Sequence, residues 1–124
     1  MSEHDEQSAL VAWFKRQYPQ YSLCIMAIPN GQLLGGRNKF ALMNKLKKEG
    51  FKNGVSDLFI AVPVNGKHGL WVEMKDRGKP PSSVSKEQSD HLDLMISMGY
   101  EGIWAAGADI AIAAITVYMS EAKK

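Results

Sequence analysis

The chain has 124 residues and a formal net charge of +2, a size that suits one domain with a single core. Hydrophobic residues make up 45% and charged residues 23% of it, as in an ordinary soluble globular protein. No apolar run approaches the ~20 residues that cross a bilayer, and the acidic N-terminus lacks the layout of a signal peptide. The single cysteine, Cys24, excludes an internal disulfide. We therefore expect one cytoplasmic domain over residues 1–124 and exclude a membrane protein or a disulfide scaffold.

The first predicted element is an amphipathic helix over residues 3–18. Ser2 and Asp5 form an S-x-x-D capping signal, and apolar residues repeat at helical spacing behind it. Continuing the apolar stripe backwards places Glu3 and Gln7 on one face of this helix. Acidic residues in the first turn also suit the positive end of the helix dipole.

A strand and a second helix are predicted next. Residues 21–28 form an apolar run that predicts a short buried strand, which ends at the turn Pro29-Asn30-Gly31. Residues 37–49 predict a helix that stops at Gly50. The residues expected on its inward face are Phe40, Met43 and Leu46.

The centre of the chain predicts a β-hairpin. Residues 54–60 and 71–75 are rich in β-branched and aromatic side chains, as strands are. Asn65-Gly66 lies between them, and this dipeptide suits the φ > 0 that a tight hairpin turn requires. The two runs are therefore expected to pair as antiparallel strands.

Three ionisable residues lie at one end of this hairpin. Antiparallel pairing would bring Asp57 near Glu73, and period-2 alternation places Lys75 on the same face as Glu73. Such groups are costly to bury unless they pair or hold a metal, and two converging carboxylates suit Mg²⁺ or Mn²⁺. The residues alone also allow an exposed Glu73–Lys75 ion pair with Asp57 in a turn. The apolar run directly after Asp57 favours the metal site.

The C-terminal third predicts a loop, a helix, a strand and a last helix. Residues 76–83 are rich in proline, glycine and serine without periodicity, so they predict a loop. Ser85 and Gln88 form an S-x-x-Q capping box that opens the helix. Residues 102–106 predict a short strand, and Asp109 would cap the last helix. The order α-β-α-β-β-α-β-α predicts an α/β fold, a mixed sheet flanked by helices.

Four sequence blocks occur in an order that resembles a known nuclease family. Asp57 with Glu73-Met74-Lys75 resembles the D…(D/E)-x-K signature of the restriction-endonuclease-like, PD-(D/E)XK, nucleases. Three further blocks resemble the virus-type replication-repair nuclease (VRR-NUC) domain, and the likeness covers nearly the whole chain. Those blocks are Pro29-Asn30-Gly31, Gly54-Val55-Ser56-Asp57-Leu58 and Ser85-Lys86-Glu87-Gln88.

The resemblance implies roles for individual residues at a metal-dependent active site. Glu3 and Gln7 match an E-x-x-x-Q pattern in the first helix of the family, where such a glutamate helps to bind metal; Glu6 and Gln7 remain the alternatives. The expected ligands of Mg²⁺ or Mn²⁺ are Glu3, Asp57, Glu73 and the backbone carbonyl of Met74. The expected catalytic residues are Asp57, Glu73, Lys75 and Gln88.

DNA is the substrate that the resemblance implies. Small stand-alone, phage-like members resemble Holliday-junction resolvases, and a symmetric four-way junction suits a homodimer with two active sites. We therefore expect a bacterial or phage-encoded endonuclease that cuts branched DNA. A flap or restriction-type endonuclease, or an inactive DNA-binding module, remains an alternative. The expected DNA contacts are Gln7, Asn30, Arg37, Lys39, Arg77 and Lys79.

Overall fold

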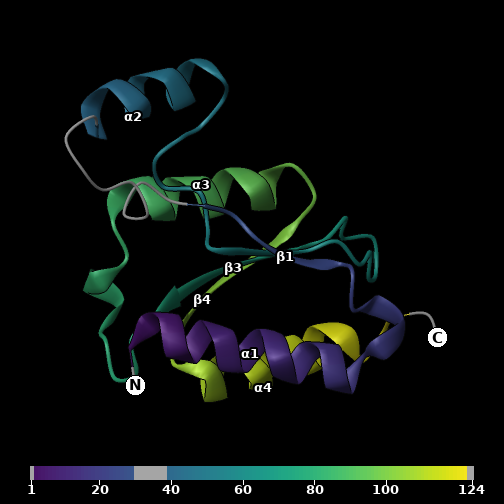
Figure 1. Cartoon of the computed structure of the whole chain (residues 1–124). Coiled ribbons are helices and arrows are strands. Elements are labelled where there is room, and N and C mark those ends of the chain that lie inside the picture. Colours follow the sequence, from purple (N-terminus) through teal and green to yellow (C-terminus); the bar gives the residue numbers. More distant parts are fainter. Residues whose placement is uncertain (1, 30–38, 123–124) are drawn as a thin grey trace.

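The computed structural model describes residues 2–29 and 39–122, and this part of the chain forms a four-stranded mixed sheet between helices (Figure 1). The predicted order of helices and strands is confirmed, with short 3₁₀ turns at Pro19–Tyr21 and Pro81–Ser83 in addition. None of the described helices combines the length and apolar content needed to cross a membrane. The elements are α1 (Glu3–Gln17), β1 (Ile25–Ala27), α2 (Lys39–Lys48), β2 (Leu58–Ile60), β3 (Leu70–Lys75), α3 (Lys86–Ser97), β4 (Glu101–Ala106) and α4 (Ala108–Met119).

The sheet places the two acid-bearing segments at its centre. The strand order is β1-β2-β3-β4, with antiparallel pairing of β1 with β2 and of β2 with β3. β3 and β4 pair in parallel, and the chain crosses between them through α3. Because β2 and β3 each have a neighbour on both sides, the backbone that carries Asp57 and Glu73 is held from either side.

Helices cover both faces of the sheet. In Figure 1, α1 and α4 lie side by side against one face, and α3 lies over the other. The predicted stripe of α1 is confirmed, since Leu10 and Phe14 are fully buried. They pack in a core with the inward side chains of β2, β3 and α4, such as Met74 and Ile115. Burial of a side chain of this size stabilises the fold by about 1.5–3 kcal/mol, so the core fixes α1 against the sheet.

The predicted hairpin is also confirmed. Val64 and Lys67 pair across the turn, and the two residues between them have positive φ, 49° at Asn65 and 80° at Gly66. Two-residue hairpin turns need this backbone conformation because it matches the twist of the strands. The turn reverses the chain, and β2 then pairs with β3 in a register in which Leu58 lies opposite Val72, one residue out of step with the Val64–Lys67 pair.

The first strand is shorter than predicted. The sequence predicts a buried strand over residues 21–28, but β1 contains Ile25–Ala27, and Leu23 is 93% exposed. Pro19 starts a 3₁₀ turn instead, and the Cys24 N–H donates back to the Tyr21 carbonyl at 2.8 Å. The prediction was wrong here because a run of apolar residues does not show where a local turn will withdraw them from the ladder.

The second helix has the predicted position but not the predicted packing. It runs from Lys39 to Lys48, yet Phe40, which was expected to face inward, is 80% exposed. Figure 1 shows α2 standing away from the sheet on the side of α3. An amphipathic stripe is buried only if another layer lies against it, and the described residues place α2 at the edge of the molecule.

The last helix begins without the predicted cap. Gly107 is the residue before α4, and Asp109, predicted to cap the helix, lies within its first turn. The Asp109 carboxylate instead accepts a hydrogen bond from Arg77 Nη1 at 2.8 Å. The prediction was wrong because β4 continues to Ala106, so that α4 begins directly after one glycine.

Candidate active site

Three carboxylates from separate elements converge at one end of the hairpin. Glu3 comes from the first turn of α1, Asp57 directly precedes β2, and Glu73 lies in β3. One carboxylate oxygen from each lies within 4.8 Å of the others. Asp57 and Glu73 are buried, and Glu3 is half-buried. The predicted meeting of Asp57 with Glu73 is therefore present, and α1 adds Glu3 to it.

Backbone contacts hold Asp57 in place. Its carbonyl accepts from the Ile28 N–H at 2.8 Å, which continues the pairing of β1 with β2 by one residue. Its Oδ2 accepts from the Met74 N–H at 2.8 Å. Because Ile28 directly follows β1 and Met74 lies in β3, Asp57 is held from both sides at the end of the central strands, next to Glu73.

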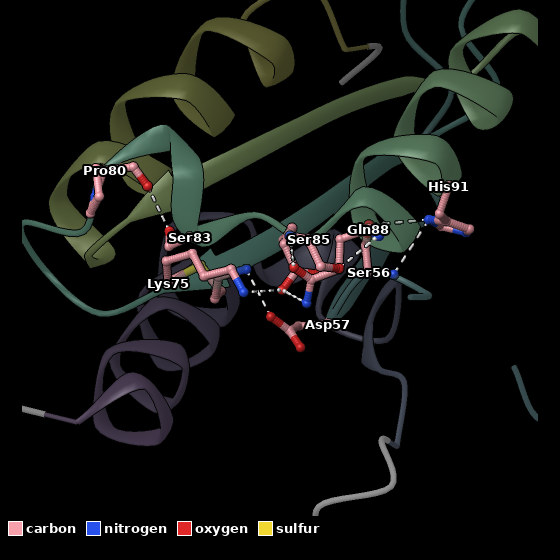
Figure 2. Close-up of polar contacts among 10 residues, drawn as sticks. Ser56, Asp57, Lys75, Pro80, Ser83, Ser85, Gln88 and His91 are labelled. Carbon is pink, nitrogen blue, oxygen red and sulfur yellow. Dashed lines mark hydrogen bonds and ion pairs between the residues drawn. The ribbon is translucent and has the colours of Figure 1, made fainter. Parts of the chain in front are cut away.

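The two oxygens of Glu73 differ in their surroundings. Glu73 Oε2 accepts from Gln88 Nε2 at 3.1 Å and lies 3.6 Å from Lys75 Nζ. Glu73 Oε1 is buried and has no hydrogen-bond partner among the described residues. Figure 2 shows Asp57, Lys75 and Gln88 pointing toward one another around this point. A buried carboxylate oxygen without a donor is costly unless a cation occupies the space beside it.

In the absence of a cation, the surroundings of the cluster disfavour the ionised forms of Glu73 and Glu3. Burial first, and then the neighbouring Asp57 carboxylate, raise the pKa of Glu73 to about 8, although the Lys75 ammonium acts in the opposite direction. Partial burial and then Asp57 also raise the pKa of Glu3. The three acidic groups therefore suit a positive ligand, because a divalent cation would remove the mutual repulsion.

The raised pKa of Glu73, caused first by burial and then by Asp57, predicts a pH-dependent effect of Glu73→Gln on the stability of the protein in EDTA. Because the pKa of Glu73 is raised from 4.5 to about 8 in the folded state, folding is opposed once the group must ionise. The free-energy cost of ionising Glu73 is absent below its pKa in the unfolded chain and complete above its pKa in the folded protein. The melting temperature of the variant, relative to the wild type, should therefore rise between about pH 5 and about pH 9.

Thermal unfolding followed by circular dichroism measures this difference. Glu101→Gln is a matched control, because Glu101 begins β4 opposite Leu70, at the far end of β3 from Lys75. If the difference in melting temperature between Glu73→Gln and the wild type stays constant over the pH range, the pKa of Glu73 is not raised.

The capping box of α3 directs Gln88 to the site. Ser85 Oγ accepts from the Gln88 N–H, and Gln88 Oε1 accepts from the Ser85 N–H at 2.9 Å, as predicted. The amide nitrogen of Gln88 is then free to donate to Glu73. Gln88 therefore has both functions that the sequence allowed: it caps α3 and it contacts a site carboxylate.

A close contact between Gly54 and α3 positions the segment before Asp57. Gly54 has φ +83°, and a Cβ atom there would lie 2.7 Å from Glu87 Cβ and 2.8 Å from the Glu87 carbonyl carbon. A side chain at this position would push the loop away from the N-terminus of α3. Gly54 thus keeps the loop that leads to Asp57 against the helix that carries Gln88.

Gly54→Ala is therefore expected to destabilise the fold by about 2–4 kcal/mol, the sum of left-handed backbone strain and overpacking. Gly66→Ala is the matched control, because Gly66 has a similar φ of +80° but open space around it. The control should cost only about 1–2 kcal/mol. Urea unfolding of both variants measures the difference, and equal losses would show that the Glu87 contact is unimportant.

A serine and a histidine that were not predicted as site residues support the same loop. Ser56 is fully buried, its N–H donates to His91 Nδ1 at 3.4 Å, and its Oγ lies 3.2 Å from the same nitrogen (Figure 2). The His91 ring packs edge-on against Trp71, and burial lowers the pKa of His91. The only sequence signal for Ser56 was its place beside Asp57.

The structure distinguishes the three candidate residues of α1. Glu3 lies with Asp57 and Glu73, whereas Glu6 is buried against Arg77 and the first N–H of α4. Gln7 lies on the next turn after Glu3 and is half-buried. The geometry therefore places Glu3 in the acidic cluster and directs Glu6 to a different set of contacts.

The remaining predicted site residues have varied positions. Met74 has a buried side chain, and its backbone N–H contacts Asp57. Lys79 is exposed in the loop after β3, and Lys39 is the first residue of α2. Arg77 binds Glu6 and Asp109, so a phosphate would have to share its guanidinium group with them. Asn30 and Arg37 lie outside the described residues.

The fold has a counterpart among solved structures. No protein-family model and no curated protein matches the chain. A solved structure described as "VRR_NUC domain protein" is similar to it, with a TM-score of 0.81 and 25% sequence identity. The similarity covers 98% of this chain and 90% of that chain. The fold, the meeting of its acidic residues and this match support a VRR-NUC domain, of a nuclease-domain family.

Proposed function

We propose that residues 1–124 act as one metal-dependent, structure-specific DNA endonuclease, which resolves four-way junctions as a homodimer. The observation that carries the proposal is the cluster of Glu3, Asp57 and Glu73, with the buried Glu73 Oε1 that has no hydrogen-bond partner among the described residues. Carboxylate oxygens of this number and spacing fit a hard divalent cation, Mg²⁺ or Mn²⁺. The Met74 carbonyl is the further ligand that the family resemblance implies. We place the activity in the cytoplasm, as that of a bacterial or phage-encoded protein.

The reaction is hydrolysis of a phosphodiester. A water oxygen forms a bond to phosphorus while the bond from phosphorus to the leaving alkoxide breaks. When bound, the cation would neutralise charge on the phosphoryl oxygens and stabilise the leaving group. Lys75 presents its ammonium group beside Glu73, where it can orient the attacking water and balance negative charge. Gln88 holds Glu73 without adding charge.

DNA binding would depend on groups around this centre. Lys79, in the loop after β3, is exposed next to the β3 end that carries Lys75. Lys39, Asn30, Arg37, Arg77 and Gln7 are the other proposed contacts. Phosphate contacts position a duplex and are independent of its sequence. The homodimer would present two active sites to the two equivalent strands of a symmetric junction.

Cleavage of labelled four-way junction, flap and linear duplex, each with Mg²⁺, Mn²⁺ or EDTA, tests the proposal. We expect paired incisions in the junction with either cation and none in EDTA. Cutting only the flap, or the linear duplex equally well, would replace junction resolution with flap or restriction-type activity. Light scattering after size exclusion tests the homodimer. Binding without cutting of any substrate would indicate an inactive DNA-binding module.

A further inference from the structure

A second acidic residue of α1 is buried outside the carboxylate cluster. Glu6 has no exposed surface, and it accepts hydrogen bonds from Arg77 Nε at 3.2 Å and from Arg77 Nη2 at 3.3 Å. Arg77 Nη2 also lies 3.0 Å from the other Glu6 oxygen. Arg77 follows Lys75 by two residues, so this fork joins α1 to the chain just beyond the end of β3.

Glu6 also serves the N-terminus of α4. Gly107, the residue before α4, has no side chain that could accept from the free N–H groups of the helix. The Ala108 N–H donates to Glu6 Oε2 instead, at the helix end where the dipole favours a carboxylate. The Gly107 N–H donates to the Lys75 carbonyl at 3.0 Å. One junction therefore connects α1, the end of β3 and the start of α4.

The first turn of α1 has no other buried anchor. Within the described residues, the buried side chains of this helix are Glu6, Leu10 and Phe14. Leu10 lies seven residues after Glu3, which is about 10 Å along a helix axis. Among the described residues of α1, Leu10 and Phe14 thus hold the middle of the helix, and Glu6 is the buried side chain in the turn that carries Glu3.

We infer that Glu6 is a positioning residue: through Arg77 and Ala108 it sets Glu3 of α1 against the Asp57–Glu73 pair and Lys75. The inference rests on the proposed metal site. The Arg77 side chain is 53% exposed, and an ion pair with a solvent-exposed partner contributes little to stability. Charge-assisted, two-pronged contacts do fix orientation, however, and an apolar residue at this position would leave the first turn free to rotate. The positioning of Glu3 thus explains why residue 6 is a buried glutamate and not an apolar residue.

Titration calorimetry with Mn²⁺ on the full chain tests this role, at a temperature where circular dichroism shows every variant folded. Glu6→Gln keeps an acceptor for Ala108 but loses the charge that holds Arg77. It is expected to weaken Mn²⁺ binding about tenfold, as losses of groups behind metal ligands commonly do. Asp109→Asn is the matched control, because it removes the other carboxylate that binds Arg77 without altering α1. The control should change the dissociation constant less than about twofold, since exposed charges are screened.

Wild-type Mn²⁺ affinity in Glu6→Gln, even with a lower melting temperature, would reduce Glu6 to a structural residue and overturn the inference. If Asp109→Asn weakens Mn²⁺ binding as much as Glu6→Gln does, the inference is also overturned, since the loss of a negative charge would explain the effect of either variant. Should Glu6→Gln fail to fold, Arg77→Lys decides: it keeps the charge and loses the fork, so unchanged affinity overturns the inference. If Glu73→Gln binds Mn²⁺ as the wild type does, the proposed metal site fails as well.

Discussion

Replacing Glu73 with glutamine is expected to lower the rate of junction cleavage by about 10³-fold, a loss of several kcal/mol of transition-state stabilisation. Glu73 is central to the cluster, since it lies beside Asp57 and Glu3 and also contacts Lys75 and Gln88. Glutamine keeps the size and the contact with Gln88 but removes the charge that a cation needs. Binding of the junction should be nearly unchanged, because phosphate contacts elsewhere carry most of the affinity.

Single-turnover cleavage and gel-shift binding assays, carried out with the same junction, separate the two quantities. Glu101→Gln makes the same chemical change at the opposite end of the parallel strand pair and should cleave at the wild-type rate. A Glu73→Gln variant that cleaves like the wild type would remove Glu73 from the reaction. Lost binding with unchanged cleavage of bound DNA would make it a DNA-contacting residue only.

Replacing Lys75 with alanine is expected to lower cleavage by about 10²–10³-fold, as for other groups that stabilise charge in the transition state. The side chain of Lys75 is 14% exposed, and its Nζ lies 3.6 Å from Glu73 Oε2. In contrast to Glu73→Gln, this variant should still bind Mn²⁺, because it removes a positive charge and no ligand. The two variants therefore divide the site into metal-holding and water-positioning groups.

Lys67→Ala is the matched control for this second variant, because Lys67 lies at the hairpin turn, before the other end of β3. It should retain wild-type cleavage. The measurement pairs single-turnover rates with Mn²⁺ calorimetry on the same samples. Cleavage at the wild-type rate by Lys75→Ala would show that the ammonium group is not needed.

Local signals in the sequence predicted much of the fold. Asn65-Gly66 and the two β-branched runs predicted the hairpin, since this dipeptide readily adopts the positive φ of a two-residue turn. Ser85 and Gln88 predicted the start of α3 through hydrogen bonds within one turn. Such features depend on neighbours in the chain, so they can be recognised without knowledge of the rest of the molecule.

Predictions that depended on remote neighbours were less successful. Phe40 has helical spacing, but no layer covers α2 among the described residues, so the side chain is exposed. Asp109 has the chemistry of a cap, yet Gly107 directly precedes α4 and Asp109 pairs with Arg77. In both cases the local pattern was present and the position of another element decided the outcome.

By itself, the sequence determined the order of the elements and the pairing that brings Asp57 to Glu73, because turns, caps and strand alternation act over a few residues. Only the tertiary structure placed Glu3, and not Glu6, in the carboxylate cluster with Asp57 and Glu73. These residues lie one turn apart on nearly the same helical face, and their chemistry is identical. Their surroundings differ. At Glu3, α1 lies against the ends of the central strands, where Asp57 and Glu73 are. At Glu6, it contacts Arg77 and the start of α4.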